Sequence, residues 1–303
     1  ITDVAFDSTY PERELAKERE VIVDEINTYK DSPSDMIFDT FEDMIFEGSE
    51  LGHNILGTKA ALARHGTDSI RRFTGRTYTT DQMVFSSIGN FSVTTARDTA
   101  ARYLAERHTP TRSFQRAVPA VTPAFEKVLN KHTHQVHCIV GARAYDINDE
   151  RRVPLSLLVN ILGGPSANSL LNVLLREKNG LSYNIEASYS PYNDCGFVAI
   201  YFSSEHDNAD QCRELIARQI DLMRRETLSA RRLSMAKKQF LAQMAISMEN
   251  NESYMLGAGK SLLMHDDIDT LEEVYRKVAA VTAQQITDVA NEIFSTTSML
   301  MYK

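Results

Sequence analysis

Two glutamates, Glu18 and Glu25, stand seven residues apart in the stretch KEREVIVDEINTYKDSPSD at 17–35. At 100° per residue, the predicted helix carries one apolar stripe, made of Leu15, Ile22, Ile26 and Tyr29. Both carboxylates fall within that stripe, nearly in line and roughly 10 Å apart along the helix axis. Unpaired glutamates are rarely fully buried. Either the stripe is half-buried and the acids reach water at its rim, or they meet a cation or perform chemistry.

The helix that carries these glutamates is expected to open at Thr9-Tyr10-Pro11-Glu12. Thr9 can cap the helix, Glu12 can reach back to Thr9, and Pro11 suits a first turn. We therefore predict one helix over 9–30.

The composition excludes some classes of protein. The chain has 303 residues, of which 43% are hydrophobic and 24% charged, as in a globular protein of about two domains. Its net charge of −8 includes no basic block, which argues against nucleic-acid binding. No apolar run approaches the roughly 20 residues of a membrane span. The three cysteines, Cys138, Cys195 and Cys212, indicate neither a disulfide framework nor a cysteine-based zinc site. A cytoplasmic location is favoured, with the periplasm as the alternative.

The chain resembles itself on either side of a proline-containing segment, 108–130, which we predict as a linker. YTTDQMVFS at 78–86 matches FSTTSMLMY at 294–302, an offset of 294 − 78 = 216, and each is expected to be a strand. The helix 9–30 and the stretch after it resemble 228–248 and its successor, at an offset of about 219. At that offset, Lys237 and Met244 stand opposite Glu18 and Glu25, so the second copy keeps the helix without its acids. This indicates a role for the acids that is special to the first copy.

The offset also predicts the domain boundaries. The second copy begins near His132, so the first copy would begin near position −84 and lack roughly 85 residues. We expect residues 1–107 to be the carboxy-terminal part of a first lobe and 131–303 to be a complete second lobe. The alternative is a genuine half-lobe, which would leave apolar surface uncovered.

The second lobe is predicted to belong to the α+β class. Strands are expected at 134–143, 183–191 and 196–203 and at the end of the chain, and SPYNDCG joins two of them as a hairpin. Helices are expected at 150–162, 167–178, 206–225, 228–248, 269–279 and 282–293. Clustered strands followed by clustered helices indicate two related lobes, each a mostly antiparallel sheet packed with helices.

Several stretches resemble the pitrilysin family of zinc metallopeptidases, the inverzincins, in its bacterial and mitochondrial-processing-peptidase-like branch. They are EREVIVDEI at 18–26, ELGHNILGT at 50–58, the expected strand MVFSSIGNF at 83–91, and LLREKNGLSYNIEASYSPYNDCGF at 174–197. The resemblance covers essentially the whole chain. It implies two lobes that close around a peptide, with zinc in the first lobe held by H-x-x-E-H and a downstream glutamate.

The resemblance implies roles for four residues. Glu25 would be the downstream zinc ligand, and Glu18 the carboxylate that supports a ligand histidine. In the second lobe, Arg176 and Tyr183 would hold the substrate, with the tyrosine hydroxyl able to donate to the oxyanion. GGPSANSLL, which precedes them, lacks the Ser-Arg-Leu form usual in the family.

H-x-x-E-H is absent from the chain, since the histidines at 53, 65, 108, 132, 134, 137, 206 and 265 form no such pair. HTHQVH at 132–137 is a weaker metal candidate, because no acid completes it nearby. His53 and His65 have no partner pattern and are taken as structural.

Three functions follow from the resemblance. The first is part of a zinc-dependent metalloendopeptidase that hydrolyses enclosed peptides or unfolded polypeptides, with the chain itself expected to be inactive. The second is a noncatalytic subunit that binds or presents peptide in a homodimer or in a heterodimer with a homologous subunit. The third is a structural subunit like those of respiratory complexes. Retention of Glu18, Glu25, Arg176 and Tyr183 favours the first.

Overall fold

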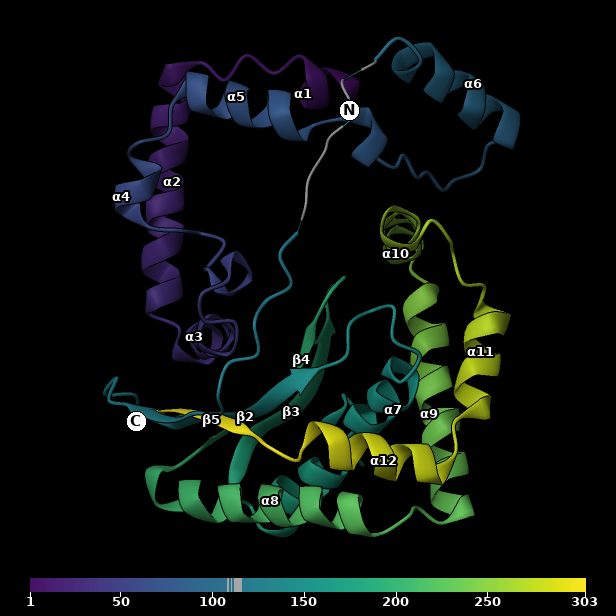
Figure 1. Cartoon of the computed structure of the whole chain (residues 1–303). Coiled ribbons are helices and arrows are strands. Elements are labelled where there is room, and N and C mark those ends of the chain that lie inside the picture. The colour runs from purple at the N-terminus through teal and green to yellow at the C-terminus, as the bar shows by residue number, and fades with distance from the viewer. Residues whose placement is uncertain (108, 110, 112–115) are drawn as a thin grey trace. The chain divides into compact units, whose positions relative to one another are not determined.

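The computed structural model of the chain describes residues 1–107, 109, 111 and 116–303. They form two compact units, which Figure 1 shows with the element labels used below. Unit 1 takes its residues from 1–28, 56–117 and 245–270, and unit 2 from 29–55, 118–244 and 271–303. The units therefore interleave along the chain.

A five-stranded sheet forms the centre of unit 2. Its strands are β1 (Glu126–Leu129), β2 (Val136–Ala144), β3 (Ser182–Pro191), β4 (Gly196–Ser204) and β5 (Ser298–Tyr302). They follow the order β1-β5-β2-β4-β3, and all neighbours are antiparallel except β1 and β5. The predicted α+β class is confirmed, and so is the hairpin between β3 and β4, where the Tyr192 N–H donates to the Cys195 carbonyl at 2.7 Å.

β1 corrects one expectation, because it lies within the segment 108–130 that we predicted as a linker. Its residues pair with β5 at the end of the sheet, and three of its four residues are exposed. The sequence of β1, EKVL, shows no alternation of apolar and polar residues, so it carries no periodic signal of a half-buried strand.

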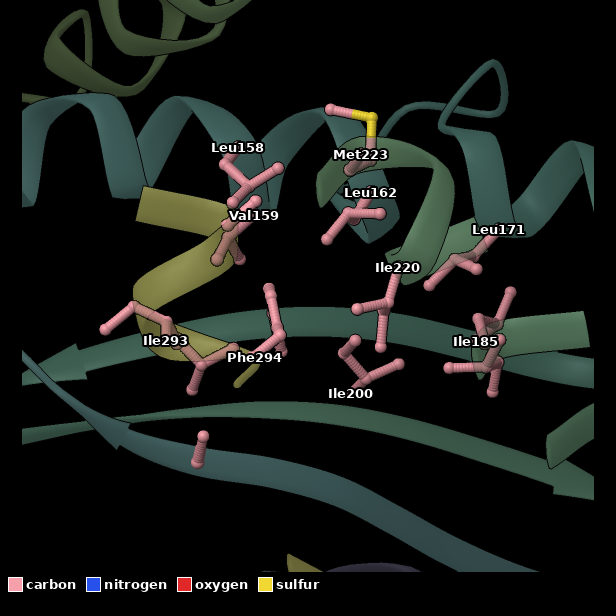
Figure 2. Close-up of a cluster of buried hydrophobic side chains, with 14 of the residues drawn as sticks. Leu158, Val159, Leu162, Leu171, Ile185, Ile200, Ile220, Met223, Ile293 and Phe294 are labelled. Atoms are coloured by element: carbon pink, nitrogen blue, oxygen red, sulfur yellow. The ribbon is translucent and has the colours of Figure 1, made fainter. Parts of the chain in front are cut away.

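Helices cover both faces of this sheet. On one face lie α7 (Arg152–Gly163), α8 (Ala209–Arg225) and α12 (Ala283–Ile293), whose apolar side chains meet those of the strands in Figure 2. On the other face lies α3 (Pro33–Ile45), with Phe41 and Phe46 fully buried against Phe197. Every residue of β4 is buried, because its alternate side chains enter two different cores.

The other elements of unit 2 are short or lie around the sheet. They are η1 (Glu50–Gly52), the π-helix η3 (Asn172–Lys178), η4 (His206–Asn208), α11 (Leu271–Ala280) and most of α9 (Ala230–Met248). The strands and helices predicted within 131–303 thus lie within a residue or a few of their predicted ranges, except that η3 begins later than the helix predicted at 167. No range was predicted for the helix at 251–265.

Unit 1 consists of helices. They are α1 (Thr2–Phe6), most of α2 (Glu12–Lys30), α4 (Lys59–Leu62), α5 (Thr67–Thr77), η2 (Thr80–Gln82), α6 (Val93–Leu104) and α10 (Asn251–His265). The expected cap between Thr9 and Glu12 is wrong: the Glu12 carboxylate accepts from the Thr67 N–H at 2.8 Å, which lowers the pKa of Glu12 and joins α2 to α5. Across the described part of the chain, no helix combines the length and the apolar character that a membrane crossing needs.

The helices of the predicted repeat recur, but its strand does not. α5 and α12 begin at 67 and 283 and end at 77 and 293, an offset of 216 at both ends. α2 and α9 each have 19 residues and are offset by 230 − 12 = 218. By contrast, neither 78–86 nor 83–91 is a strand. β5 lies between β1 and β2, whereas the described residues of unit 1 include no strand with which 78–91 could pair.

Candidate functional site

Glu18 and Glu25 lie on the unit 1 part of α2, and both are exposed. Of the predicted stripe, Ile26 is buried, while Leu15, Ile22 and Tyr29 are half-buried. Of the two alternatives that the sequence left open, this exposure matches the half-buried stripe. They stand at the rim of a partly buried stripe, where water solvates their carboxylates.

The residues present do not fit a complete zinc centre. Among the described residues, no group of three or more His, Cys, Asp or Glu side chains is arranged to hold a metal ion. A protein zinc site normally requires three or four such ligands. Glu25 alone cannot supply them, and the histidines of HTHQVH belong to no such group among the described residues.

Arg176 lies on η3, a π-helix that ends in a sharp reversal of the chain. The Gly180 N–H donates to the Arg176 carbonyl at 3.0 Å, and the Leu181 N–H donates to the Leu175 carbonyl at 2.8 Å. Gly180 has φ +61°, a conformation that glycine adopts without a steric cost. The Lys178-Asn179-Gly180 turn thus sends the chain from the helix of Arg176 directly into β3. π-Helical turns occur frequently at functional sites.

Tyr183 lies at an irregularity of β3. Ser182 pairs with Ser204 and Asn184 with Ser203, so Tyr183 is an extra residue without an opposing partner. The Ser182 hydroxyl lies 2.8 Å from the carbonyl oxygens of both Asn184 and Ser203 and supports this bulge. A bulge changes the direction of the side chain that it carries, and Tyr183 is 64% exposed.

Arg176 and Tyr183 line the same pocket, of about 360 Å³, within unit 2. Its other walls are the Gly163-Gly164-Pro165-Ser166-Ala167 loop after α7, Asn172 of η3, and residues 184–187 of β3. A Cβ atom on Gly163 would lie 2.7 Å from the Ala187 backbone nitrogen, so glycine lets the loop approach the strand closely. Arg176 and Tyr183, which the resemblance assigns to substrate binding, thus border one pocket, and that role stays a prediction.

The pocket also borders an open strand edge. β3 ends the strand order, so one of its backbone edges faces no strand among the residues that the structure describes. The outward N–H and C=O groups of an edge strand can pair with another extended chain. Five consecutive β3 residues, 183–187, line the pocket.

Two glutamines of α9 hold the glycine loop by hydrogen bonds. The Gln243 amide accepts from Asn160 Nδ2 and donates to Ser166 Oγ, each at 2.8 Å. Four residues earlier, on the same side of the helix, Gln239 accepts from Asn168 Nδ2 at 2.8 Å.

Sequence reasoning missed most of these wall residues. Nothing in the residue types of Asn172, Asn184 or Glu186 marks them, since polar residues at such spacings are usual on solvated surfaces. The same holds for Gln243, which bonds the loop from outside the pocket lining. The Gly163-Gly164 pair was the available signal, because paired glycines mark a close approach of two backbones.

Comparisons with known proteins identify relatives over almost the whole chain. Residues 67–240 match the family described as the peptidase M16 inactive domain. The Bacillus subtilis protein named "Uncharacterized zinc protease YmxG" is 30% identical over 298 residues, covering 97% of this chain and 71% of that protein. An "Uncharacterized zinc protease" of Rickettsia bellii is 28% identical, with 98% and 72% covered.

A solved structure shares the fold. The peptidase M16 inactive domain from Pseudomonas fluorescens superimposes with a TM-score of 0.86 at 16% identity, over 99% of this chain and 72% of that one. Since the family match spans more than half of the chain and the Bacillus relative matches almost all of it, the chain belongs to the M16, or pitrilysin, family of peptidases.

Proposed function

We propose that unit 2 binds extended peptide segments along the open edge of β3 and serves a zinc-dependent endopeptidase in this way. The observation that carries the proposal is the pocket in which Arg176 and Tyr183 meet five consecutive residues of that edge.

An extended peptide fits this arrangement chemically. Its backbone can pair with the outward N–H and C=O groups of β3, as in other cases of strand addition. The Arg176 guanidinium and the Tyr183 hydroxyl are donors, and both side chains are accessible. They would donate to peptide carbonyl oxygens, and the tyrosine hydroxyl would continue to donate as such an oxygen gains negative charge. Gly163 and Gly164 supply a wall without side chains.

Hydrolysis requires more than this chain presents. The sequence contains no H-x-x-E-H, and the described residues supply no three-ligand metal cluster. In the proposal, Glu25 is a zinc ligand and Glu18 is the carboxylate beside it. Both side chains are exposed. Glu25 can therefore bind a zinc ion whose other ligands are supplied from elsewhere, and Glu18 can stand beside it.

A second candidate is a noncatalytic subunit that presents peptide to an active homologue. The matched family is itself described as an inactive domain. Under this alternative, peptide binding at β3 persists, but the partner is a homologous subunit. Peptide turnover would then begin on addition of such a subunit, whereas addition of zinc alone would not produce it.

The experiment is a binding titration with a fluorescein-labelled, unstructured peptide about as long as the 10-residue strand β3. Arg176→Ala removes a charged donor, so we expect affinity to fall roughly 10–100-fold. Tyr183→Phe removes a neutral donor and should weaken binding by a few-fold to about tenfold.

Arg218→Ala is the matched control, because Arg218 is also an exposed arginine next to an acid, Glu214, but lies on α8 away from this pocket. The control should bind like the unmodified chain. If the chain binds no peptide, or if Arg176→Ala and Arg218→Ala bind alike, the proposed site is wrong.

A further inference from the structure

A second pocket of unit 2, of about 700 Å³, lies between η3, α8 and α9 and has no part in the proposed peptide site. Its apolar wall includes Leu170 and Val173, Leu222 and Met223 of α8, and Met235 of α9. None of its lining residues is aromatic. The volume is typical of sites for small molecules, and the lining suits an aliphatic body better than a ring that needs stacking.

A buried hydroxyl in this wall has no partner. Ser169 is 3% exposed, and its Oγ atom makes no hydrogen bond within the described structure. Nearby amides are already paired, as Asn168 donates to Gln239. Most buried polar side-chain atoms have a partner, so an exception calls for an explanation such as a bound molecule. Its Oγ atom has almost no accessible surface, however, so a ligand in this pocket would meet the exposed Lys178 and Arg232 side chains rather than this hydroxyl.

The charges of the lining favour an anion. Lys178 and Arg232 contribute two cations, and Glu226 is the single acid. This lining is positive although the whole chain has a net charge of −8. A ligand with one negative group complements such a surface, since charge-assisted hydrogen bonds are stronger than neutral ones.

We propose that this pocket binds an aliphatic monocarboxylate, such as a fatty acid of medium length. The hydrocarbon chain packs on the leucine, valine and methionine side chains. The carboxylate takes its donors from Lys178 and Arg232.

This pocket and the peptide pocket share a wall. Residues 168–170 and Val173, Leu174 and Lys178 line the aliphatic pocket, whereas 163–167, Asn172 and Arg176 line the other. A ligand in the aliphatic pocket would therefore pack against the segment that carries Arg176.

The test is calorimetric titration of the 303-residue chain with sodium decanoate. 1-Decanol has the same tail without the charge, and decyltrimethylammonium carries the opposite charge. We expect saturable binding of decanoate, weaker binding of decanol, and no binding of the cation. Binding of all three alike would show only unspecific association with apolar surface and would overturn the proposal.

Two variants test the location. Arg232→Glu should weaken decanoate binding roughly tenfold or more, whereas Arg231→Glu, at the neighbouring exposed arginine outside the lining, should not. Ala236→Phe fills the pocket from its wall and should abolish binding. If decanoate does not bind, or binds Arg232→Glu as well as Arg231→Glu, the proposal is wrong, even should Ala236→Phe fail to fold.

Discussion

Tyr183 owes its exposure to the bulge of β3. In a regular strand, side chains alternate between two faces, and here both Ser182 and Ile185 are buried. The extra residue between the pairs of Ser182 and Asn184 lets Tyr183 leave this alternation and face the pocket of Arg176. A single inserted residue thus changes a core position into a potential binding position.

His137 should make the stability of unit 2 depend on pH. Burial lowers the pKa of His137 below its usual 6.5, so the folded chain takes up its proton less readily than the unfolded chain. Stability from this residue is complete above pH 6.5 and is lost as the pH falls toward the folded pKa. Its surroundings include the Tyr201 hydroxyl, Lys30, Asp31, Lys131 and two histidines.

The measurement is urea unfolding between about pH 5 and pH 8. Neutral His137→Gln should lose part of the decrease in the free energy of unfolding that the unmodified chain shows on acidification. His134→Gln, at an exposed position three residues before His137, is the control and should keep the whole decrease. Identical pH dependence of both variants would contradict the assignment.

For individual residues, the sequence predicted the direction of a side chain around its helix axis better than the degree to which the side chain is buried. Periodicity placed Ile26 on the buried face of α2 correctly. It also placed Glu18 and Glu25 on that face, where they are exposed. A helical stripe indicates direction around the axis, but the depth to which it is buried depends on the elements packed against it.

At the level of elements, α3 is held to its sheet by aromatic packing. Phe41 is fully buried, with its ring centroid 5.6 Å from that of Phe125 and 6.3 Å from that of Phe197. Phe41→Ala should destabilise unit 2 by about 3–5 kcal/mol, because it leaves a cavity in a close-packed core.

This loss of stability is measured by chemical denaturation, in which unfolding is monitored through a signal that reports on the sheet. Phe73→Ala on α5 is the control, because Phe73 is 53% exposed and its removal should change stability by less than about 0.5 kcal/mol. A loss below about 1 kcal/mol for Phe41→Ala would show that α3 is not part of this core.

Elements with long-range partners were the hardest to predict from sequence. Helices α5 and α12 follow the predicted offset because helix patterns are local. The expected strand at 83–91 has the composition of a strand, but the described part of unit 1 contains no strand with which it could pair. β1 pairs with β5, but its residues have little of the composition that is typical of a strand. Strand formation depends on partners distant in sequence, which composition does not reveal.

For the whole molecule, we predict that the 303-residue chain has no peptidase activity of its own. One carboxylate cannot form a site that normally has three protein ligands and a water molecule. The 303-residue chain should bind zinc no more tightly than in the micromolar range and should not cleave a quenched fluorogenic peptide. Zinc titration and a cleavage assay with and without chelator check this. Chelator-sensitive turnover by the purified chain would contradict it.

Pairing of a peptide with the open edge of β3 is measured by amide hydrogen exchange of the chain at peptide saturation. Outward-facing amides within 184–190 should become protected, because their N–H groups gain carbonyl partners. Amides of β4, which already has strands on both sides, should exchange as before. Binding of the peptide without added protection of β3 would contradict the account.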